Sequence, residues 1–308
     1  MLYSIDVLCE VFMIIISTEA TADCPESIFR DDLKIIPMGY TVNGIGYDGI
    51  NEKLSPHEFY EAVANAKTKS DLPQTTMVTE YTATEFFENL LKQGHDIIHI
   101  GFSSHLSGTF EQETKAVNAL KEKYPERKIT LIDSFSACFG EGLIAYYALQ
   151  KKDEGASYEE IVEYTKSIIQ NSNAIFVIDD LMHLCRTGRA AKSEAYLGTA
   201  FHVKPILYIA NDGSLQPFAK EISQKKALKT MLKVFENNAW SPEKTKLIGI
   251  GHADDLESAN LVIDSIKEMG YTNVIPFDVG PVIGTHVGKG MICIIFMGNE
   301  KDQTIKNR

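Results

Sequence analysis

The chain has 308 residues, which is longer than most single hydrophobic cores and favours two globular domains. Its formal net charge of -12 argues against nucleic acid and against an anionic membrane surface as partners, because both depend on clustered Lys and Arg. No run reaches the roughly 20 apolar residues of a membrane-spanning helix. The five cysteines include no C-x-x-C pair, so we expect a cytoplasmic protein with reduced thiols and no stable membrane insertion.

The amino terminus is apolar but does not resemble a signal peptide. Residues 1–12 carry Asp6 and Glu10 and lack the basic segment that opens a secretory signal. Met13 begins a clean strand pattern. We therefore expect residues 1–12 to be a loose, disordered or non-native extension, with Met13 as an alternative start.

The first half of the chain alternates strand and helix patterns. Three continuous apolar runs, at 14–17, 96–101 and 128–133, are typical of strands buried on both faces of a parallel sheet. Between the last two runs a helix is predicted from Gly108 to Tyr124. Its buried face is expected to consist of Phe110, Thr114, Val117 and Leu120. This β-α-β order predicts a Rossmann-like α/β domain with a parallel sheet.

A polar segment that ends in Gly155 marks an expected domain boundary, with domains at residues 1–155 and 156–308. The second half opens with a capping box formed by Ser157 and Glu160. The strand patterns that follow lie at 174–179, 204–209, 215–219, 247–251, 274–278 and 291–297, and the helix patterns at 225–238 and 256–269. Hairpin-like strand pairs with two intervening helices predict an α+β domain with a mixed or antiparallel sheet layered by helices.

The densest polar segment, residues 103–109, lies between a buried strand and the start of a helix. Ser104, Ser107 and Thr109 supply hydroxyls, and Gly108 allows close approach of the backbone. Open α/β sheets bind ligands at this edge, where the N–H groups of a helix point into a crevice. The segment therefore indicates an anion site. The alternative is an ordinary serine-rich turn that caps the helix.

Two further segments are weaker candidates. Residues 74–79 place the hydroxyls of Thr75 and Thr76 where they can face the same crevice, although by themselves they are better explained as a turn ahead of a helix. Residues 280–290 contain four glycines around His286, which indicates a backbone that bends tightly or approaches something closely. This segment does not satisfy the nucleotide P-loop pattern, because its spacing is one residue short and Gly290 replaces the Ser/Thr.

Cationic and metal-ligating residues occur together once, at 183–192. Arg186 and Arg189 flank Gly188 and can reach an anion or a partner, or can simply form a solvated helix entrance. His183 and Cys185 are interpreted as a loop histidine and a packed thiol, because zinc requires several converging ligands. We expect no metal and no cofactor.

Taken together, these segments resemble the DegV family, bacterial fatty acid-binding proteins that include the binding subunit of fatty acid kinase. The resemblance covers nearly the whole chain after Met13. Six patterns carry it in the family's order: T-D-S-T-A-D at 18–23, P-x-T-S-Q-P-S at 73–79, S-S-x-L-S-G-T at 103–109, D-S-x-x-x-x-x-G-x-G at 133–142, K-P-I-L with G-x-L-x-P at 204–217, and I-G-x-H-x-G-P-G at 283–290. The third matches completely, whereas Glu19 and Ala20 depart from the first, residues 73–79 match the second imperfectly, and Lys289 departs from the last.

The resemblance implies that a long-chain fatty acid lies buried between the two domains and that the chain is a carrier without catalytic residues of its own. It implies that hydroxyls of Thr75 and Ser107 hold the carboxylate. The other ligand-binding candidates are Ser104, Thr76, Gly108, Thr109 and His286.

The same resemblance implies a partner, an ATP-dependent fatty acid kinase subunit that phosphorylates the bound acid near His286 and Arg189. Ile222 stands where kinase-dependent members carry the Arg of a basic K-x-R stretch, and Thr187 alters the loop before Gly188. These departures concern docking of the kinase rather than binding of the lipid.

Two enzyme classes remain as alternatives. A Ser-dependent hydrolase or acyltransferase would use Ser107 and His286, although no G-x-S-x-G elbow is present. A nucleotide-binding enzyme is disfavoured by the incomplete P-loop pattern and by the lack of G-x-G-x-x-G after the first strand.

Overall fold

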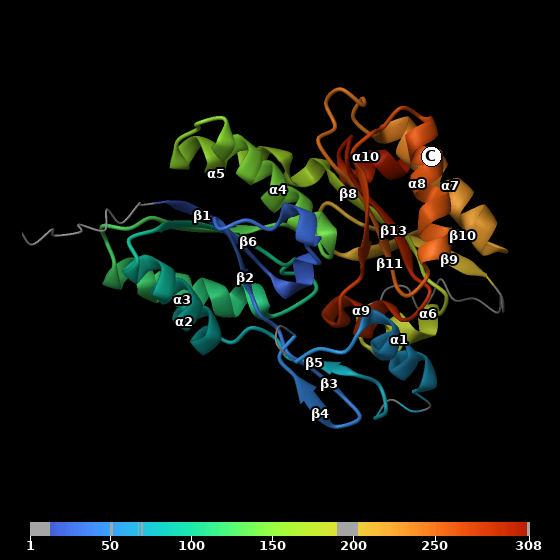
Figure 1. Cartoon of the computed structure of the whole chain (residues 1–308), viewed down its shortest axis with the longest axis horizontal. Coiled ribbons are helices and arrows are strands. Elements are labelled where there is room, and N and C mark those ends of the chain that lie inside the picture. The colour runs from blue at the N-terminus through green and yellow to red at the C-terminus, as the bar shows by residue number, and fades with distance from the viewer. Residues whose placement is uncertain (1–12, 50–51, 67, 69, 190–202, 307–308) are drawn as a thin grey trace, which may run out of the picture.

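The computed structural model describes residues 13–49, 52–66, 68, 70–189 and 203–306 (Figure 1). Two predictions fall outside these residues: the amino-terminal extension at 1–12, and the Ala190–Lys192 end of the Arg-containing segment. None of the described helices is long and apolar enough to cross a bilayer.

The first half of the chain forms a four-stranded sheet in which every neighbouring pair is parallel, as predicted. Its strands, in spatial order, are β2 (Leu33–Ile36), β1 (Ile14–Glu19), β6 (Asp96–Gly101) and β7 (Ile129–Asp133). Helices cover both faces, with α2 and α3 on one side and α4 and α5 on the other (Figure 1). Their bounds are α2 Glu80–Lys92, α3 Thr109–Lys123, α4 Phe139–Asp153 and α5 Tyr158–Ile168.

The second half forms a six-stranded sheet that is antiparallel except for its last pair, which confirms the predicted mixed sheet. Its strands, in spatial order, are β10 (Leu215–Glu221), β9 (Lys204–Ile209), β8 (Ser172–Val177), β13 (Ile292–Met297), β11 (Ile248–His252) and β12 (Val274–Asp278). Two helices, α7 (Gln224–Asn238) and α8 (Leu256–Glu268), cover its outer face, and α4 packs on its inner face (Figure 1). The helix α4 thus contacts both sheets.

A small third sheet and several short helices, none of them predicted, lie where the two halves meet (Figure 1). The sheet consists of β4 (Ile45–Tyr47), β3 (Tyr40–Val42) and β5 (Gln74–Thr75). The helices are α1 (Pro56–Asn65), α6 (Leu181–Arg186), α9 (Pro281–Val287) and α10 (Lys301–Lys306). Gly284 lets α9 approach α1 closely, since a Cβ there would lie 2.5 Å from the Tyr60 hydroxyl.

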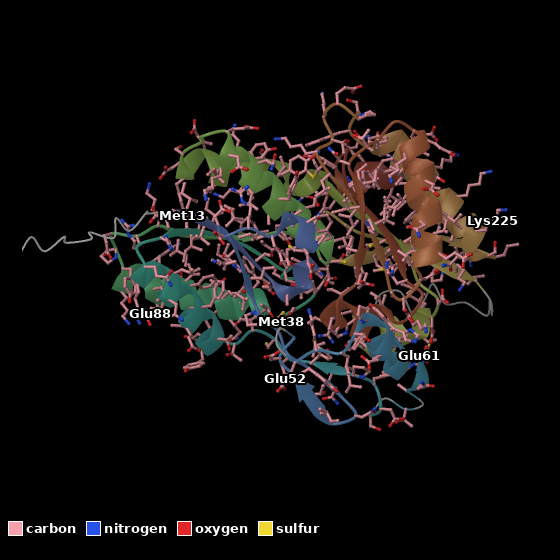
Figure 2. The ribbon with its side chains drawn as sticks, viewed as in Figure 1. Met13, Met38, Glu52, Glu61, Glu88 and Lys225 are labelled. Carbon is pink, nitrogen blue, oxygen red and sulfur yellow. The ribbon has the colours of Figure 1, made fainter. Side chains whose placement is uncertain are left out.

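The hydrophobic core is continuous between the halves. Ile16 and Ile98 of the parallel sheet belong to the same buried cluster as Leu207 and Ile295 of the mixed sheet. Charged side chains such as Glu61 lie on the outside of the molecule (Figure 2). The two halves are therefore packed against each other over an apolar surface. A cavity between them is lined mainly by apolar side chains for the same reason.

The buried face of α3 differs from the predicted one. Phe110 and Thr114 are only half-buried, whereas Glu113 is fully buried. The Glu113 carboxylate faces His99 of β6, with 3.2 Å between Oε1 and Nε2. A pattern of apolar residues cannot predict a buried glutamate, because the partner that makes its burial tolerable lies on another element.

Candidate functional site

A cavity of about 280 Å³ lies between the loops at the carboxyl ends of the parallel sheet and the inner face of the mixed sheet. This volume is close to the lower end of the range of small-molecule sites, about 300–1,000 Å³. Both halves of the chain contribute side chains to its wall. Six apolar residues from the mixed sheet form what we term the apolar floor: Ala174, Phe176, Ile209, Leu215, Cys293 and Ile295.

The apolar floor follows from strand geometry. Successive side chains of a strand alternate between its two faces, so Ala174 and Phe176 of β8 point to the same side, as do Cys293 and Ile295 of β13. Strands β8 and β13 are neighbours in the sheet, and Phe176 pairs with Cys293. The floor is therefore a continuous apolar surface without a charged group.

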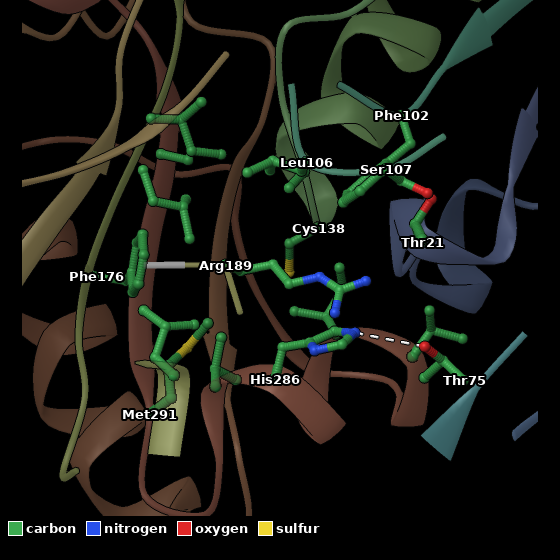
Figure 3. Close-up of a pocket in the computed structure, with 18 of the residues that line it drawn as sticks. Thr21, Thr75, Phe102, Leu106, Ser107, Cys138, Phe176, Arg189, His286 and Met291 are labelled. Carbon is green, nitrogen blue, oxygen red and sulfur yellow. Dashed lines mark hydrogen bonds between the residues drawn. The ribbon is translucent and has the colours of Figure 1, made fainter. Parts of the chain in front are cut away.

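The opposite part of the wall carries the polar groups, which come from five separate segments. We term this set the polar rim: Thr21, Thr75, Ser107, Arg189 and His286 (Figure 3). The Thr75 hydroxyl of β5 lies 3.4 Å from His286 Nε2 of α9, so the unpredicted small sheet brings one predicted residue to another.

Ser107 lies at the start of α3 and takes the role that Gly108 cannot fill. Gly108 is the N-cap residue of α3 and has no side chain, so Ser107 Oγ accepts from the Thr109 backbone N–H at 3.2 Å. The Ser107 hydroxyl also donates to Thr109 Oγ1 at 3.1 Å. The Ser107 hydroxyl thus caps the helix and also lines the cavity.

The structure brings most, but not all, of the predicted residues to the cavity. Thr76 and Gly108 line its wall beside Thr75 and Ser107. Thr109 is buried behind Ser107 and does not line it, and Ser104 is exposed, with its backbone N–H 3.3 Å from an Asp133 carboxylate oxygen.

Arg189, predicted as a partner or phosphoryl-transfer residue, also lies in this wall. Its guanidinium extends into the cavity beside His286 (Figure 3), although the residue as a whole is exposed. Partial burial of the guanidinium lowers the pKa of Arg189, yet guanidinium groups stay charged in proteins. Burial, together with the positive charge of Arg189, lowers the pKa of His286 to about 4. At neutral pH the rim therefore holds one fixed cation and a neutral imidazole.

Behind Thr21 lies a group of buried carboxyls. The Thr21 hydroxyl donates to Glu141 Oε2 at 3.0 Å, and the Thr18 hydroxyl donates to the other oxygen of Glu141. Burial and the neighbouring Glu19 raise the pKa of Glu141 well above its usual range. The hydrogen of Thr21 is thus already engaged, and this side of the rim does not offer a free donor.

Asp23 fixes the position of α9. Its carboxylate accepts from the Gly280 backbone N–H at 3.0 Å and from the Cys138 thiol at 3.1 Å. Burial raises the pKa of Asp23 to about 7 despite these two hydrogen bonds, which lower it. Because Gly280 begins α9, this contact holds His286 over the cavity.

The hydrogen bonds of the described residues do not join Ser107 to His286. Ser107 bonds Thr109 and His286 Nε2 contacts Thr75, while His286 Nδ1 is buried without a hydrogen-bond partner in the described part of the chain. A nucleophile activated by a histidine requires that contact, and a further group to orient the ring. The arrangement offers an anion a cation and hydroxyls, and it does not display a preformed triad.

Sequence reasoning missed Thr21 and the whole apolar floor. Thr21 had a usable signal, since it lies in the polar segment directly after the first buried strand, where ligands of open sheets bind. The floor had none, because Phe176 and Ile295 read as ordinary core residues of strands.

The chain is similar to known proteins over nearly its whole length. The DegV family model, described as that of an uncharacterised protein family, matches residues 13–299. A DegV domain-containing protein of Clostridium perfringens is 35% identical, with 94% of this chain and 98% of that protein covered.

Solved structures show the same architecture. The crystal structure described as DegV, a fatty acid binding protein from Bacillus subtilis, is 27% identical, with a TM-score of 0.78 over 93% of this chain and 99% of that chain. A DegV-family protein from Ruminococcus gnavus, refined with vaccenic acid, has a TM-score of 0.81 at 21% identity and covers 92% of this chain and 99% of that chain.

Proposed function

This chain belongs to the DegV family, and on that premise we propose that it binds one long-chain fatty acid in the cavity between its two sheets. The Bacillus subtilis relative is described as a fatty acid binding protein. The observation that carries the proposal is a single cavity with an apolar floor at one end and a cationic, hydroxyl-bearing rim at the other. That polarity matches an acyl chain with a carboxylate head group.

The tail supplies most of the affinity. Burying about 15 methylenes at roughly 0.8 kcal/mol each contributes on the order of 12 kcal/mol. Association and ordering of the ligand cost an estimated 4–15 kcal/mol, so the net affinity rises with the number of methylenes that are buried. The apolar floor has no group that distinguishes one methylene from another, and chain length is therefore set by how much of the tail fits.

The head group lies against Thr75, Arg189 and His286 in this proposal. An ionised carboxylate removed from water needs hydrogen bonds and an opposite charge. Arg189 supplies the charge, and the Thr75 hydroxyl can turn from His286 to the ligand. The Ser107 hydroxyl can turn from Thr109 in the same way. The head group is less favoured beside Thr21, because the Thr21 hydroxyl already donates its hydrogen to Glu141.

Native mass spectrometry of protein purified without added lipid tests the proposal. We expect a mass increment of one long-chain fatty acid per chain, and fatty acid in an organic extract of the same sample. The double variant Thr75→Val/Ser107→Ala should retain less fatty acid; its midpoint of thermal unfolding is measured as well, because Ser107 also caps α3. Its matched control is Thr82→Val/Ser265→Ala, since neither of those residues lines the cavity. A wild-type protein that arrives empty and does not take up added palmitate contradicts the proposal.

A carrier rather than an enzyme is the role we propose for the isolated chain. Incubation with a fluorophosphonate and with a fatty acyl ester distinguishes the two. We expect neither labelling of Ser107 nor ester hydrolysis, because Ser107 has no hydrogen bond to His286. Stoichiometric labelling of Ser107 would support the hydrolase alternative instead.

Presentation of the bound acid to a separate ATP-dependent kinase is the second part of the proposal. The division of the chain into two domains near residue 155 is proposed separately. Ile222 is 71% exposed just after β10, so a partner can reach the position where the resemblance expects an Arg. Acyl-phosphate formation with a fatty acid kinase subunit and ATP tests this part. Ile222→Arg should increase the rate if this position contacts the kinase, and an unchanged rate would remove it from the interface.

A further inference from the structure

A second group of polar side chains is buried away from the cavity, inside the first half of the chain. Glu19 ends β1, His99 lies in β6 and Glu113 lies in α3, and none of the three is exposed to solvent. His99 Nε2 lies 3.2 Å from Glu113 Oε1 and 4.0 Å from Glu19 Oε1. One ligand atom from each residue lies within 4.8 Å of the other two. Three elements thus direct one nitrogen and two oxygens to one point.

The His99 and Glu113 atoms of this group lack hydrogen bonds in the described part of the chain, whereas Glu19 Oε1 accepts one from the Phe102 backbone N–H. Both carboxylate oxygens of Glu113 are buried without a hydrogen bond, and so is Nε2 of His99. A buried ionisable group that is left in this state costs several kcal/mol relative to water. A cation at the point that the three residues share would satisfy all of these atoms together.

The surroundings orient the three side chains toward that point. His99 Nδ1 lies 2.9 Å from the Ser17 hydroxyl, which leaves Nε2 directed inward. The Phe102 backbone N–H donates to Glu19 Oε1 at 2.8 Å. Gly101 leaves room for Glu113, since a Cβ there would lie 3.1 Å from Oε2. Histidines that bind metals use their second ring nitrogen in just such an outer hydrogen bond, which fixes the ring.

We propose that Glu19, His99 and Glu113 form a binding site for one divalent transition-metal ion, of which Zn²⁺ best suits one imidazole and two carboxylates. A neutral imidazole and two carboxylates balance the charge of the ion, so the buried site carries no net charge. A carboxylate that binds through both oxygens can supply the fourth ligand. The ion would join β1, β6 and α3 and would stabilise the fold. It takes no part in the proposed binding of the lipid.

Protons can supply the same balance of charge. Burial lowers the pKa of His99, but the facing carboxylates of Glu113 and Glu19 outweigh it and raise that pKa to about 9. Burial and the Glu19 carboxylate raise the pKa of Glu113 to about 7. An imidazolium at His99 beside a protonated Glu113 carboxyl is therefore the competing arrangement, and the experiment must distinguish bound protons from a bound ion.

Zinc content after dialysis tests the site. The full chain carries a second, exposed group of possible ligands, His57, Glu61 and Asp254, so the background protein is His57→Gln/Glu61→Gln. After exposure to Zn²⁺ and dialysis against metal-free buffer, we expect one zinc ion per chain in this background. Glu113→Gln should abolish it. Glu111→Gln should retain it, because Glu111 lies on the same helix but is exposed. Zinc retained by Glu113→Gln, or absent from the background protein, overturns the proposal.

A measurement on the background protein keeps the test valid if Glu113→Gln does not fold. Side-chain ¹⁵N shifts of His99 distinguish an imidazolium from an imidazole that is bound to a metal through Nε2. We expect Zn²⁺ to move Nε2 to the shift of a coordinated nitrogen, and to raise the midpoint of thermal unfolding. An imidazolium signal that Zn²⁺ does not change would assign the site to protons.

Discussion

The two ends of the cavity are built in different ways. The apolar floor comes from neighbouring strands of one sheet, whose pairing fixes each side chain relative to the next. The polar rim comes from five segments that are far apart in the chain, and contacts such as Asp23 with Gly280 hold these segments in place. The floor is therefore rigid and chemically uniform, whereas the rim is an assembly of loops and short elements.

This difference separates affinity from selectivity. A uniform floor stabilises any acyl chain in proportion to the area that it buries. A rim with one cation and several hydroxyls selects the head group, because an uncharged or cationic end would not supply a counter-charge to Arg189. Changes in the rim should therefore weaken binding equally for short and long acids, and changes in the floor should weaken it more for long ones.

The largest effect on binding is expected from Arg189→Met. Removing the one charged group of the rim leaves the carboxylate without its counter-charge. We expect a cost of about 2 kcal/mol, or about 30-fold in Kd, which is the lower end of the range for a lost charge pair because Arg189 is open to solvent. Displacement of a fluorescent fatty acid measures it. Arg186→Met is the control, since Arg186 pairs with Asp180 on the surface. Equal losses in both variants would mean that the head group does not meet Arg189.

A floor substitution, Leu215→Ala, tests the other end. Losing the contact of about two side-chain carbons with the tail, at ~0.8 kcal/mol per methylene, predicts a loss of roughly 15-fold for palmitate. Octanoate should bind almost as before, because its tail is too short to reach the far end of the floor. Leu261→Ala, on the exposed face of α8, is the control. A loss that is the same for both acids would end the distinction between floor and rim.

A smaller effect is expected from Thr75→Val. One hydroxyl contributes about 1 kcal/mol, so Kd should rise about fivefold for short and long acids alike. Thr82→Val is the matched control, because Thr82 does not line the cavity. If Thr82→Val weakened binding as much as Thr75→Val, the carboxylate would not meet the Thr75 hydroxyl.

A different kind of effect concerns the stability of the lipid-free protein against pH. The pKa of His286 is about 4 in the folded chain, below its ordinary value of 6.5. Between these values the unfolded chain binds more protons, so this residue makes the free energy of unfolding fall as the pH falls. His286→Gln removes that contribution and should gain stability relative to wild type on going from pH 6.5 toward 4. Urea unfolding measures the difference.

His57→Gln is the control for this pH dependence, since His57 is an exposed histidine paired with Asp254. It should not reproduce the relative gain at low pH. A His286→Gln curve parallel to that of wild type would mean that His286 is solvated, and that the rim is more open than the structure has it.

The sequence by itself determined the two sheets and, within the rim, marked Ser107. Continuous apolar runs predicted the parallel strands, hairpin signals predicted the mixed sheet, and hydroxyls after a strand marked Ser107. These features are local, because strand burial, turn chemistry and helix capping depend on residues close together in the chain. The complete S-S-x-L-S-G-T pattern added the family.

Only the tertiary structure decided which distant groups meet. The approach of Thr75 to His286, the entry of Arg189 into the cavity and the burial of Glu113 beside His99 each join elements that are far apart in sequence. No local pattern encodes such a contact, because a polar side chain can be buried only where another element supplies its partner. The sequence could not predict the apolar floor, because Phe176 has the pattern of an ordinary buried strand residue. Only the packing of the two halves leaves a cavity beside it.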